Sequence, residues 1–150
     1  SATYLNGEKV EREIRDREVS DNVSPVSTIA GVRARLVELQ RAMGKGGGVV
    51  MDGRDIGTVV FPDAELKIFM TARPEVRAQR RYLELVSKGM PADFGAVMRN
   101  ITERDRIDSS REASPLRKAD DAVELDNSDM TPEEQIIWFR KLYKKRTDES

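Results

Sequence analysis

Two charged motifs in this chain contain residue types that could do chemistry. The first, Asp52-Gly53-Arg54-Asp55, directly follows the apolar run Val49–Met51. A strand rarely ends in three charges unless they are solvated in a cleft, and Gly53 lets the backbone turn tightly between them. Either the motif lines a binding cleft, or an Asp–Arg pair stiffens a polar turn. The local pattern favours neither interpretation.

The second motif lies on one face of a predicted helix. Apolar residues recur at steps of three and four from Phe94 to Ile101, and the same steps continue to Arg104, Asp108 and Arg111. A helix that packs by its first half and overhangs a cleft by its second half would show this change. A helix end in solvent with ordinary ion pairs would show it too. We favour the cleft, because clustered arginines on a flap can neutralise the charge of a phosphoryl-transfer transition state.

The composition limits the reactions that the chain can support. Its 150 residues include no cysteine and no histidine, which excludes disulfides, Cys/His zinc sites, thiol nucleophiles and Ser-His-Asp triads. Acid–base catalysis would therefore depend on carboxylates. Arginines outnumber lysines by 18 to 8, and the planar guanidinium binds phosphate or carboxylate through two parallel hydrogen bonds. This bias fits an enzyme for small anionic substrates, although solvated helix faces are the simpler explanation of the bias taken alone.

Charge and hydropathy argue against several classes of partner. The formal net charge is −1 and aromatic residues make up 5%. The chain therefore lacks the basic surface and the stacking platforms of a nucleic-acid coat protein or an RNA-contacting domain. The longest uninterrupted apolar run, Ile136–Phe139, is far too short to span a membrane. With no secretory signal at its start, the sequence predicts a cytoplasmic protein with no nucleic-acid and no membrane partner.

Periodicity and turn residues predict the elements that must position these motifs. We expect, in chain order, hairpin 4–10, helix 27–43, strand 49–51, strand 66–71, helix 74–88, helix 93–109, strand 122–125 and helix 132–145. The hairpin depends on the turn Asn6-Gly7, and Ser24-Pro25 is expected to form a second turn. Strands that alternate with helices through short loops predict a parallel α/β sheet, whose ligands bind at the carboxyl ends of the strands. The first charged motif lies at such an end.

Two other motifs are interpreted as structural. The run Gly44–Gly48 precedes a strand, and its one Gly-Lys pair is followed by Gly46. It is therefore a helix stop and linker, not a G-x-x-x-x-G-K-[ST] phosphate loop, and no such loop occurs elsewhere in the 150 residues. Arg77, Arg80 and Arg81 lie beside acidic residues on one predicted helix, which indicates a solvated face.

Taken together, the motifs resemble a known family. The string from Val50 to Ala64, VMDGRDIGTVVFPDA, strongly resembles bacterial cytidylate kinases. The strings ERDRIDSSR (103–111), SPL (114–116) and ADDA (119–122) are similar to that family's lid and final strand. Near the start of the chain, Glu18–Ser20, Val23-Ser24 and Val32-Arg33 are similar to the end of its CMP-binding insert. The resemblance covers nearly the whole chain.

The resemblance implies a fold and its division into parts. The fold is an α/β, P-loop nucleoside-monophosphate-kinase-like parallel sheet with flanking helices and the remnant of a small β insert. Residues 1–26 would end the CMP-binding insert, and residues 27–150 would form a partial kinase core with a lid at about 103–118. The family's first strand and Walker A loop are absent from the 150 residues. That strand would lie between the strands at 49–51 and 66–71, and its loss would leave unpaired backbone groups in the sheet.

The resemblance also implies a reaction, in which ATP with Mg²⁺ phosphorylates CMP or dCMP. The family's cytosine contacts fall on Ser24, Arg33 and Asp55, its ribose contacts on Arg104 and Asp108, and its phosphate contacts on Arg54 and Arg111. Arg106 would reach the transferring phosphoryl group, so Arg104, Arg106 and Arg111 would stabilise charge during catalysis. No residue is assigned to ATP, because the phosphate loop is absent, and no residue is assigned to a metal.

Several alternatives stay open. The chain could close the gap in its sheet, fill it with a swapped segment of a second copy, or belong to a longer protein. As written, we expect it to be inactive. The alternative function is a non-catalytic nucleotide-binding or interaction module that keeps the monophosphate half. Among enzymes, the near alternative is a related nucleoside-monophosphate kinase.

Overall fold

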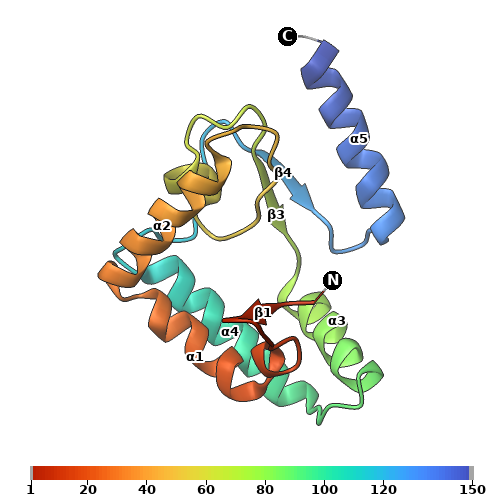
Figure 1. The fold of residues 1–150 in the computed structure, drawn as a ribbon. Coiled ribbons are helices and arrows are strands. Elements are labelled where there is room, and N and C mark those ends of the chain that lie inside the picture. The colour runs from red at the N-terminus through yellow and green to blue at the C-terminus, as the bar shows by residue number, and fades with distance from the viewer. Residues whose placement is uncertain (1, 149–150) are drawn as a thin grey trace.

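The computed structural model describes residues 2–148, in which helices alternate with short strands (Figure 1). In chain order the elements are β1 (Tyr4–Leu5), β2 (Glu8–Lys9), the 3₁₀ turn η1 (Glu13–Arg15), α1 (Arg17–Ser27), α2 (Ala30–Gly44), the π-helical turn η2 (Ile56–Val60), β3 (Ile68–Thr71), α3 (Pro74–Ser87), α4 (Phe94–Ser110), β4 (Val123–Asp126) and α5 (Pro132–Asp148). The fold is mixed α/β, as the sequence predicts.

The hairpin predicted near the N-terminus is confirmed. β1 and β2 pair antiparallel, with Tyr4 opposite Lys9. The turn residues Asn6 and Gly7 take φ values of 51° and 87°. Both values lie in the left-handed region that a two-residue hairpin turn requires, and Asn-Gly adopts it more readily than other pairs.

The parallel sheet consists of β3 and β4. The two strands pair from Ile68 with Val123 to Thr71 with Asp126. Between them the chain passes through α3 and α4, which provide the long crossover that parallel strands require. The strands predicted at 66–71 and 122–125 are therefore confirmed, and each ends within one residue of its predicted C-terminal end.

The strand predicted at Val49–Met51 does not form. These residues adopt no regular secondary structure, and Val50 is 94% exposed. So short a strand is stable only when a neighbour pairs with its backbone. Within the described residues β3 pairs with β4 alone, and the resemblance places the missing partner of Val49–Met51 outside these 150 residues. The prediction is wrong for this structure because its pairing partner is absent.

Helix α1 is the main element that the sequence analysis missed. The turn predicted at Ser24-Pro25 is wrong, since both residues lie in α1. Pro25 has no backbone N–H, so α1 lacks one helical hydrogen bond at this position. A second correction follows, because the helix predicted to begin at Ser27 begins at Ala30 instead.

The helices pack in pairs around the site region. α3 lies against α4, and α1 lies against both α4 and α2 (Figure 1). Tyr82 of α3 meets Phe94 of α4 edge to face, with ring centroids 6.1 Å apart. Asp93 caps α4, because its side chain accepts a 2.6 Å hydrogen bond from the backbone N–H of Ala96.

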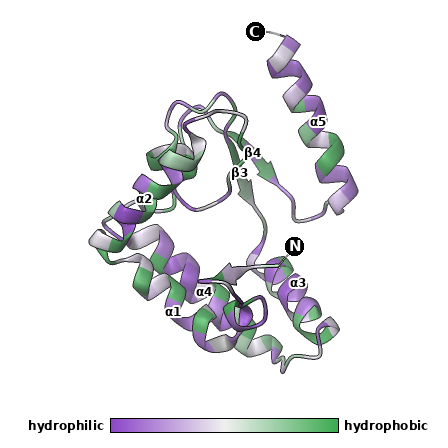
Figure 2. Cartoon of the chain, in the orientation of Figure 1, coloured by the Kyte–Doolittle hydropathy of each residue, from purple (hydrophilic) through white to green (hydrophobic). Residues whose placement is uncertain are grey.

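Buried residues of the described chain are more often polar than apolar. The buried hydrophobic residues are Val60, Ala78 and Leu125, and the buried polar residues are Ser24, Asp55, Asp108, Arg111 and Ser128. α5 projects away from the remaining helices (Figure 1), and hydrophobic residues lie along it without a covering element (Figure 2). Ile136, Ile137 and Tyr143 are each more than half exposed. Across residues 2–148, no helix combines the length and apolarity needed to cross a lipid bilayer.

Candidate functional site: a buried polar cluster beside an arginine-lined pocket

Asp55 occupies an unusual position in the backbone. It immediately precedes η2, and its carbonyl accepts hydrogen bonds from the N–H groups of Val59 at 2.8 Å and Val60 at 3.2 Å. π-helical turns of this kind are rare and occur often at functional sites. Gly53 permits the close turn, since a Cβ there would lie 2.9 Å from the side chain of Ile56. The Asp55 residue is only 3% exposed as a result.

The buried carboxylate of Asp55 pairs with an arginine from another element. The Nη2 of Arg33, on α2, forms an ion pair with Oδ2 of Asp55. The Arg33 side chain is only 12% exposed, and its Nε is buried with no hydrogen-bond partner in the described part of the chain. Because a buried unpaired donor costs free energy, this nitrogen is ready to bind a ligand acceptor.

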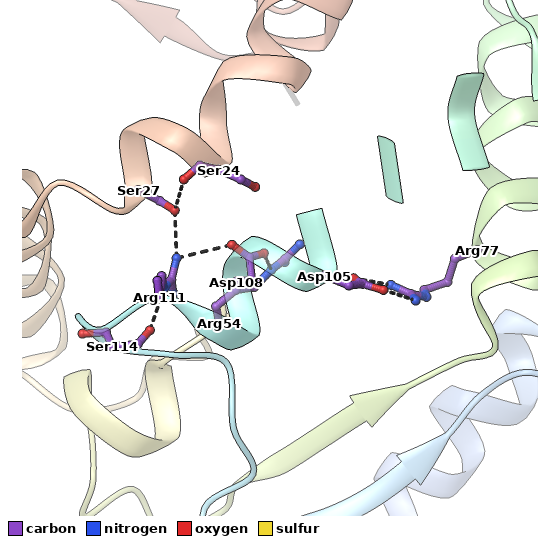
Figure 3. A network of polar contacts seen from close by, with 8 residues as sticks. All are labelled: Ser24, Ser27, Arg54, Arg77, Asp105, Asp108, Arg111 and Ser114. Carbon is purple, nitrogen blue, oxygen red and sulfur yellow. Dashed lines mark hydrogen bonds and ion pairs between the residues drawn. The ribbon is translucent and has the colours of Figure 1, made fainter. Parts of the chain in front are cut away.

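A second buried pair joins α4 to neighbouring segments. Asp108 accepts a 3.1 Å hydrogen bond from Nε of Arg54, and its other oxygen lies 3.4 Å from Nη1 of Arg111 (Figure 3). The side chains of Asp108 and Arg111 are 6% and 2% exposed. One carboxylate thus bridges two guanidinium groups, an arrangement that leaves net positive charge in the cluster.

Arg111 is held by further contacts, yet one of its nitrogens has no partner. Its Nη1 donates to Oγ of Ser27 at 2.8 Å, its Nε donates to the carbonyl of Ser114 at 2.8 Å, and Ser27 in turn donates to the carbonyl of Ser24 at 2.7 Å (Figure 3). Its Nη2 is buried and has no hydrogen-bond partner within residues 2–148. Burial lowers the pKa of Arg111, and the nearby charge of Arg33 lowers it further. The charged form therefore gains from an anionic ligand.

An arginine-lined pocket of about 240 Å³ lies between α1, α3 and α4. Its lining residues are Ser20, Arg54, Arg77, Arg81, Asn100, Ile101, Arg104 and Asp105. Among the described residues, Nε of Arg104 is buried without a hydrogen-bond partner. Burial lowers the pKa of Arg104, and the charge of Arg54 adds to this effect. The other three lining arginines pair with carboxylates of Asp108, Asp105 and Glu84, so the pocket keeps a small excess of positive charge that suits an anion.

A larger cavity of about 500 Å³ lies under the hairpin, where both acidic and basic side chains line it. It contains none of the predicted site residues. The polar cluster and the arginine-lined pocket are the better candidates for the site, because Arg33, Arg104 and Arg111 each keep one buried nitrogen without a hydrogen-bond partner among the described residues.

The structure brings most of the predicted site residues to one region. The residues joined by these contacts or by the shared pocket are Ser24, Arg33, Arg54, Asp55, Arg104, Asp108 and Arg111. Arg106 is different, because its guanidinium pairs with Glu103 at 2.6 and 2.9 Å and its side chain is 66% exposed. The structure therefore places Arg106 outside the cluster.

Four residues of the site region were missed by sequence analysis. Ser27 and Ser114 hold Arg111, while Arg77 and Arg81 line the pocket. The interpretation of Arg77 and Arg81 as a wholly solvated face is wrong. Their spacing of four residues places them on one side of α3, and that spacing was the available signal. In the described part of the chain, no group of three acidic, histidine or cysteine side chains could hold a metal ion.

The chain resembles known proteins over nearly its whole length. The family model for cytidylate kinase matches residues 1–144. The chain is 63% identical over 143 residues to a cytidylate kinase of Parabacteroides distasonis, an alignment that covers 95% of this chain and 62% of that protein. It is 57% identical to one of Bacteroides fragilis, with the same coverage. The match with one of Porphyromonas gingivalis is 58% identical over 97% of this chain and 63% of that protein. The chain thus spans less than two thirds of these relatives.

Proposed function

Because this chain belongs to the cytidylate kinase family, we propose that its parent protein transfers the γ-phosphate of ATP to CMP or dCMP. The 150 residues supply most of the nucleoside-monophosphate site. The observation that best supports this proposal is the set of buried polar residues, four of which (Ser24, Asp55, Asp108 and Arg111) belong to the predicted site. Burying charged groups is costly, and a ligand with matching donors, acceptors and charge offsets that cost.

The base would bind at Arg33, Asp55 and Ser24. Cytosine offers an amino donor beside two acceptors, so a carboxylate suits N4 and a guanidinium suits N3 and O2. The ion pair between Arg33 and Asp55 keeps both groups in place before the base arrives. Uracil would present a carbonyl to the carboxylate of Asp55, and a desolvated pair of acceptors disfavours binding strongly.

The sugar and phosphate would extend along α4. Arg104 and Asp108 would bind the ribose hydroxyls, and Arg54 with Arg111 would bind the monophosphate. Unpaired donors on Arg104 and Arg111 support these roles, because each nitrogen gains a hydrogen bond when the ligand binds. Arg106 would have to release Glu103 before it could approach a transferring phosphoryl group.

ATP would supply the phosphoryl group, and catalysis would consist mainly of positioning and charge stabilisation. The described residues offer an arginine-lined pocket for phosphate oxygens but no cluster of carboxylates for Mg²⁺. This donor set fits Mg²⁺ only if phosphate oxygens and water supply most of its ligands, as is usual for this ion.

We further propose that these 150 residues alone do not catalyse the reaction. They contain no Walker A loop, and within residues 2–148 no strand pairs with β3 on the side away from β4. The missing segment of a longer parent, or a swapped segment of a second copy, would fill that side of the sheet.

Two substitutions test the roles of individual residues. Asp55→Ala should weaken binding of CMP far more than binding of UMP, because only CMP uses the carboxylate. Arg111→Ala should weaken both nucleotides by a similar factor, because both have the same phosphate. Isothermal titration calorimetry measures each affinity. Equal losses of CMP and UMP in Asp55→Ala would contradict the base-reading role, and a loss confined to CMP in Arg111→Ala would contradict the phosphate role.

A fusion separates the kinase from a non-catalytic module. The chain would be joined to the upstream segment of the Parabacteroides distasonis relative, and ADP formation would be followed with CMP as acceptor. Turnover that requires the added segment supports the proposal. Binding of CMP without turnover in a folded fusion would favour the non-catalytic module instead.

A further inference from the structure

Arg77 joins three parts of the fold through one guanidinium group. Its Nε donates to the carbonyl of Ala72, directly after β3, at 3.1 Å. Its Nη1 and Nη2 donate to the two carboxylate oxygens of Asp105 on α4 at 2.9 and 2.6 Å (Figure 3). The hydrogen bond to Asp105 raises the pKa of Arg77. We call a guanidinium that donates to both oxygens of one carboxylate a fork. Its two parallel hydrogen bonds fix the orientation of the two side chains as well as their distance.

The position of Asp105 on α4 makes this contact relevant to the site. Arg104 precedes it directly, and Asp108 follows within one helical turn. Asp108 reaches toward α1 through Arg111, whereas Asp105 reaches toward α3 (Figure 3). The second half of α4 is therefore tied on two sides, and both ties lie next to proposed ligand contacts.

The first half of α4 is held in another way. Its contact with α3 is the edge-to-face packing of Phe94 on Tyr82, which lies about three helical turns before Asp105. Apolar packing therefore anchors the beginning of α4, and the charged fork anchors its end. Loss of the fork would leave the beginning docked and the tie through Asp108 in place, so the end of α4 could shift only on the side that faces α3.

We propose that the Arg77–Asp105 pair is a latch that sets the position of the second half of α4 and thereby aligns Arg104 and Asp108 for the ligand. The alignment part rests on the proposed function, whereas the positioning of α4 does not. Arg77 and Asp105 are positioning residues, since they would act through their neighbours. The competing explanation is an ordinary surface ion pair with little effect on anything beyond stability.

The chain contains a matched control for this proposal. Arg73 also forms a fork, with Nη1 and Nη2 at 2.9 and 2.6 Å from the carboxylate oxygens of Asp129. Asp129 lies in the loop between β4 and α5, so this pair does not touch α4. Asp105→Asn and Asp129→Asn therefore remove the same charge from forks of the same length, and only the first affects α4.

Hydrogen exchange of the unliganded chain tests the latch directly. In Asp105→Asn the amides of residues 104–110 should exchange about tenfold faster, whereas Asp129→Asn should leave them unchanged. Asp105→Glu, which keeps the charge, should restore most of the protection. Unchanged exchange in Asp105→Asn, or equal acceleration in Asp129→Asn, would overturn the latch.

Titration with CMP tests the alignment. The dissociation constant should rise about tenfold in Asp105→Asn and less than twofold in Asp129→Asn, with similar small losses in Tm for both. Faster exchange with an unchanged CMP affinity would overturn the alignment and leave the mechanical latch. If the unaltered chain binds no CMP, the CMP-binding part of the proposed function fails, and the exchange experiment still decides whether the latch exists.

Discussion

The buried pair of Arg33 and Asp55 makes a sharp prediction about stability. Arg33→Met would leave the carboxylate of Asp55, a residue only 3% exposed, without its cation. Breaking one side of a buried ion pair costs about 3–5 kcal/mol. We expect the lower end, about 3 kcal/mol, because Arg33 already carries one buried donor without a partner and the substitution removes it. The total free energy of unfolding of a domain of this size is about 5–15 kcal/mol.

Replacing both partners should reverse most of the loss. In Arg33→Met combined with Asp55→Leu no buried charge remains, and such exchanges are often neutral or stabilising. Urea unfolding followed by far-UV circular dichroism gives the free energies. Glu38→Gln is the control on the same helix, because its pair with Arg35 has side chains 70% and 67% exposed and should contribute about 0.5 kcal/mol or less. A single variant within about 1 kcal/mol of the unaltered chain, or a double variant no more stable than the single one, would refute this reasoning.

Three further outcomes follow from particular contacts. Gly44→Ala would place a Cβ 2.3 Å from the ring of Phe61, so urea unfolding should show a loss of about 1–3 kcal/mol; an unchanged midpoint would contradict the packing. Ser27→Ala removes an acceptor of the buried Arg111 side chain and should cost about 1–2 kcal/mol, with Ser27→Thr as the control that keeps the hydroxyl. Hydrogen bonds to basic neighbours on its helix lower the pKa of Glu84 from 4.5. Its contribution is therefore present above pH 4.5 and is lost as the pH falls toward the lower folded-state pKa, so the Tm difference between Glu84→Gln and the unaltered chain should shrink on acidification.

Local signals in the sequence predicted the elements that have strong local causes. The turn at Asn6-Gly7 forms as expected, with both residues in the left-handed region. The cap of α4 by Asp93 and the capping box before α5 have equally local causes, and in the capping box Thr131 and Glu134 exchange hydrogen bonds at 2.7 and 3.2 Å. Each of these features depends on residues within four positions of one another, so a single sequence contains the necessary information.

Elements that depend on distant partners could not be predicted in the same way. Val49–Met51 has the composition of a buried strand but lacks a neighbour to pair with, and it stays irregular. Helix α1 escaped notice because Ser24-Pro25 suggests a turn, and proline is unfavourable inside a helix. Because α1 was not predicted, the hydrogen bond between Ser27 and Arg111 was not predicted either.

The candidate site combines both kinds of information. The apolar-to-charged face of α4 indicated Arg104, Asp108 and Arg111, and the structure places all three at the cluster or the pocket. The family resemblance, which the match over residues 1–144 confirms, supplied the roles that spacing could not. The ion pair of Arg77 could not be predicted from the sequence, because its partner Asp105 lies 28 residues away. Only the packing of α3 on α4 brings the two side chains together.

Calorimetric titration of the folded, unaltered chain with CMP, UMP and AMP tests whether these 150 residues contain a cytidine monophosphate site. We propose that Ser24, Arg33, Asp55 and the residues around Arg111 form that site. On this proposal, CMP binds in clear preference to UMP and AMP. Equal binding of the three nucleotides, or no binding of CMP by a chain that circular dichroism shows to be folded, would contradict it.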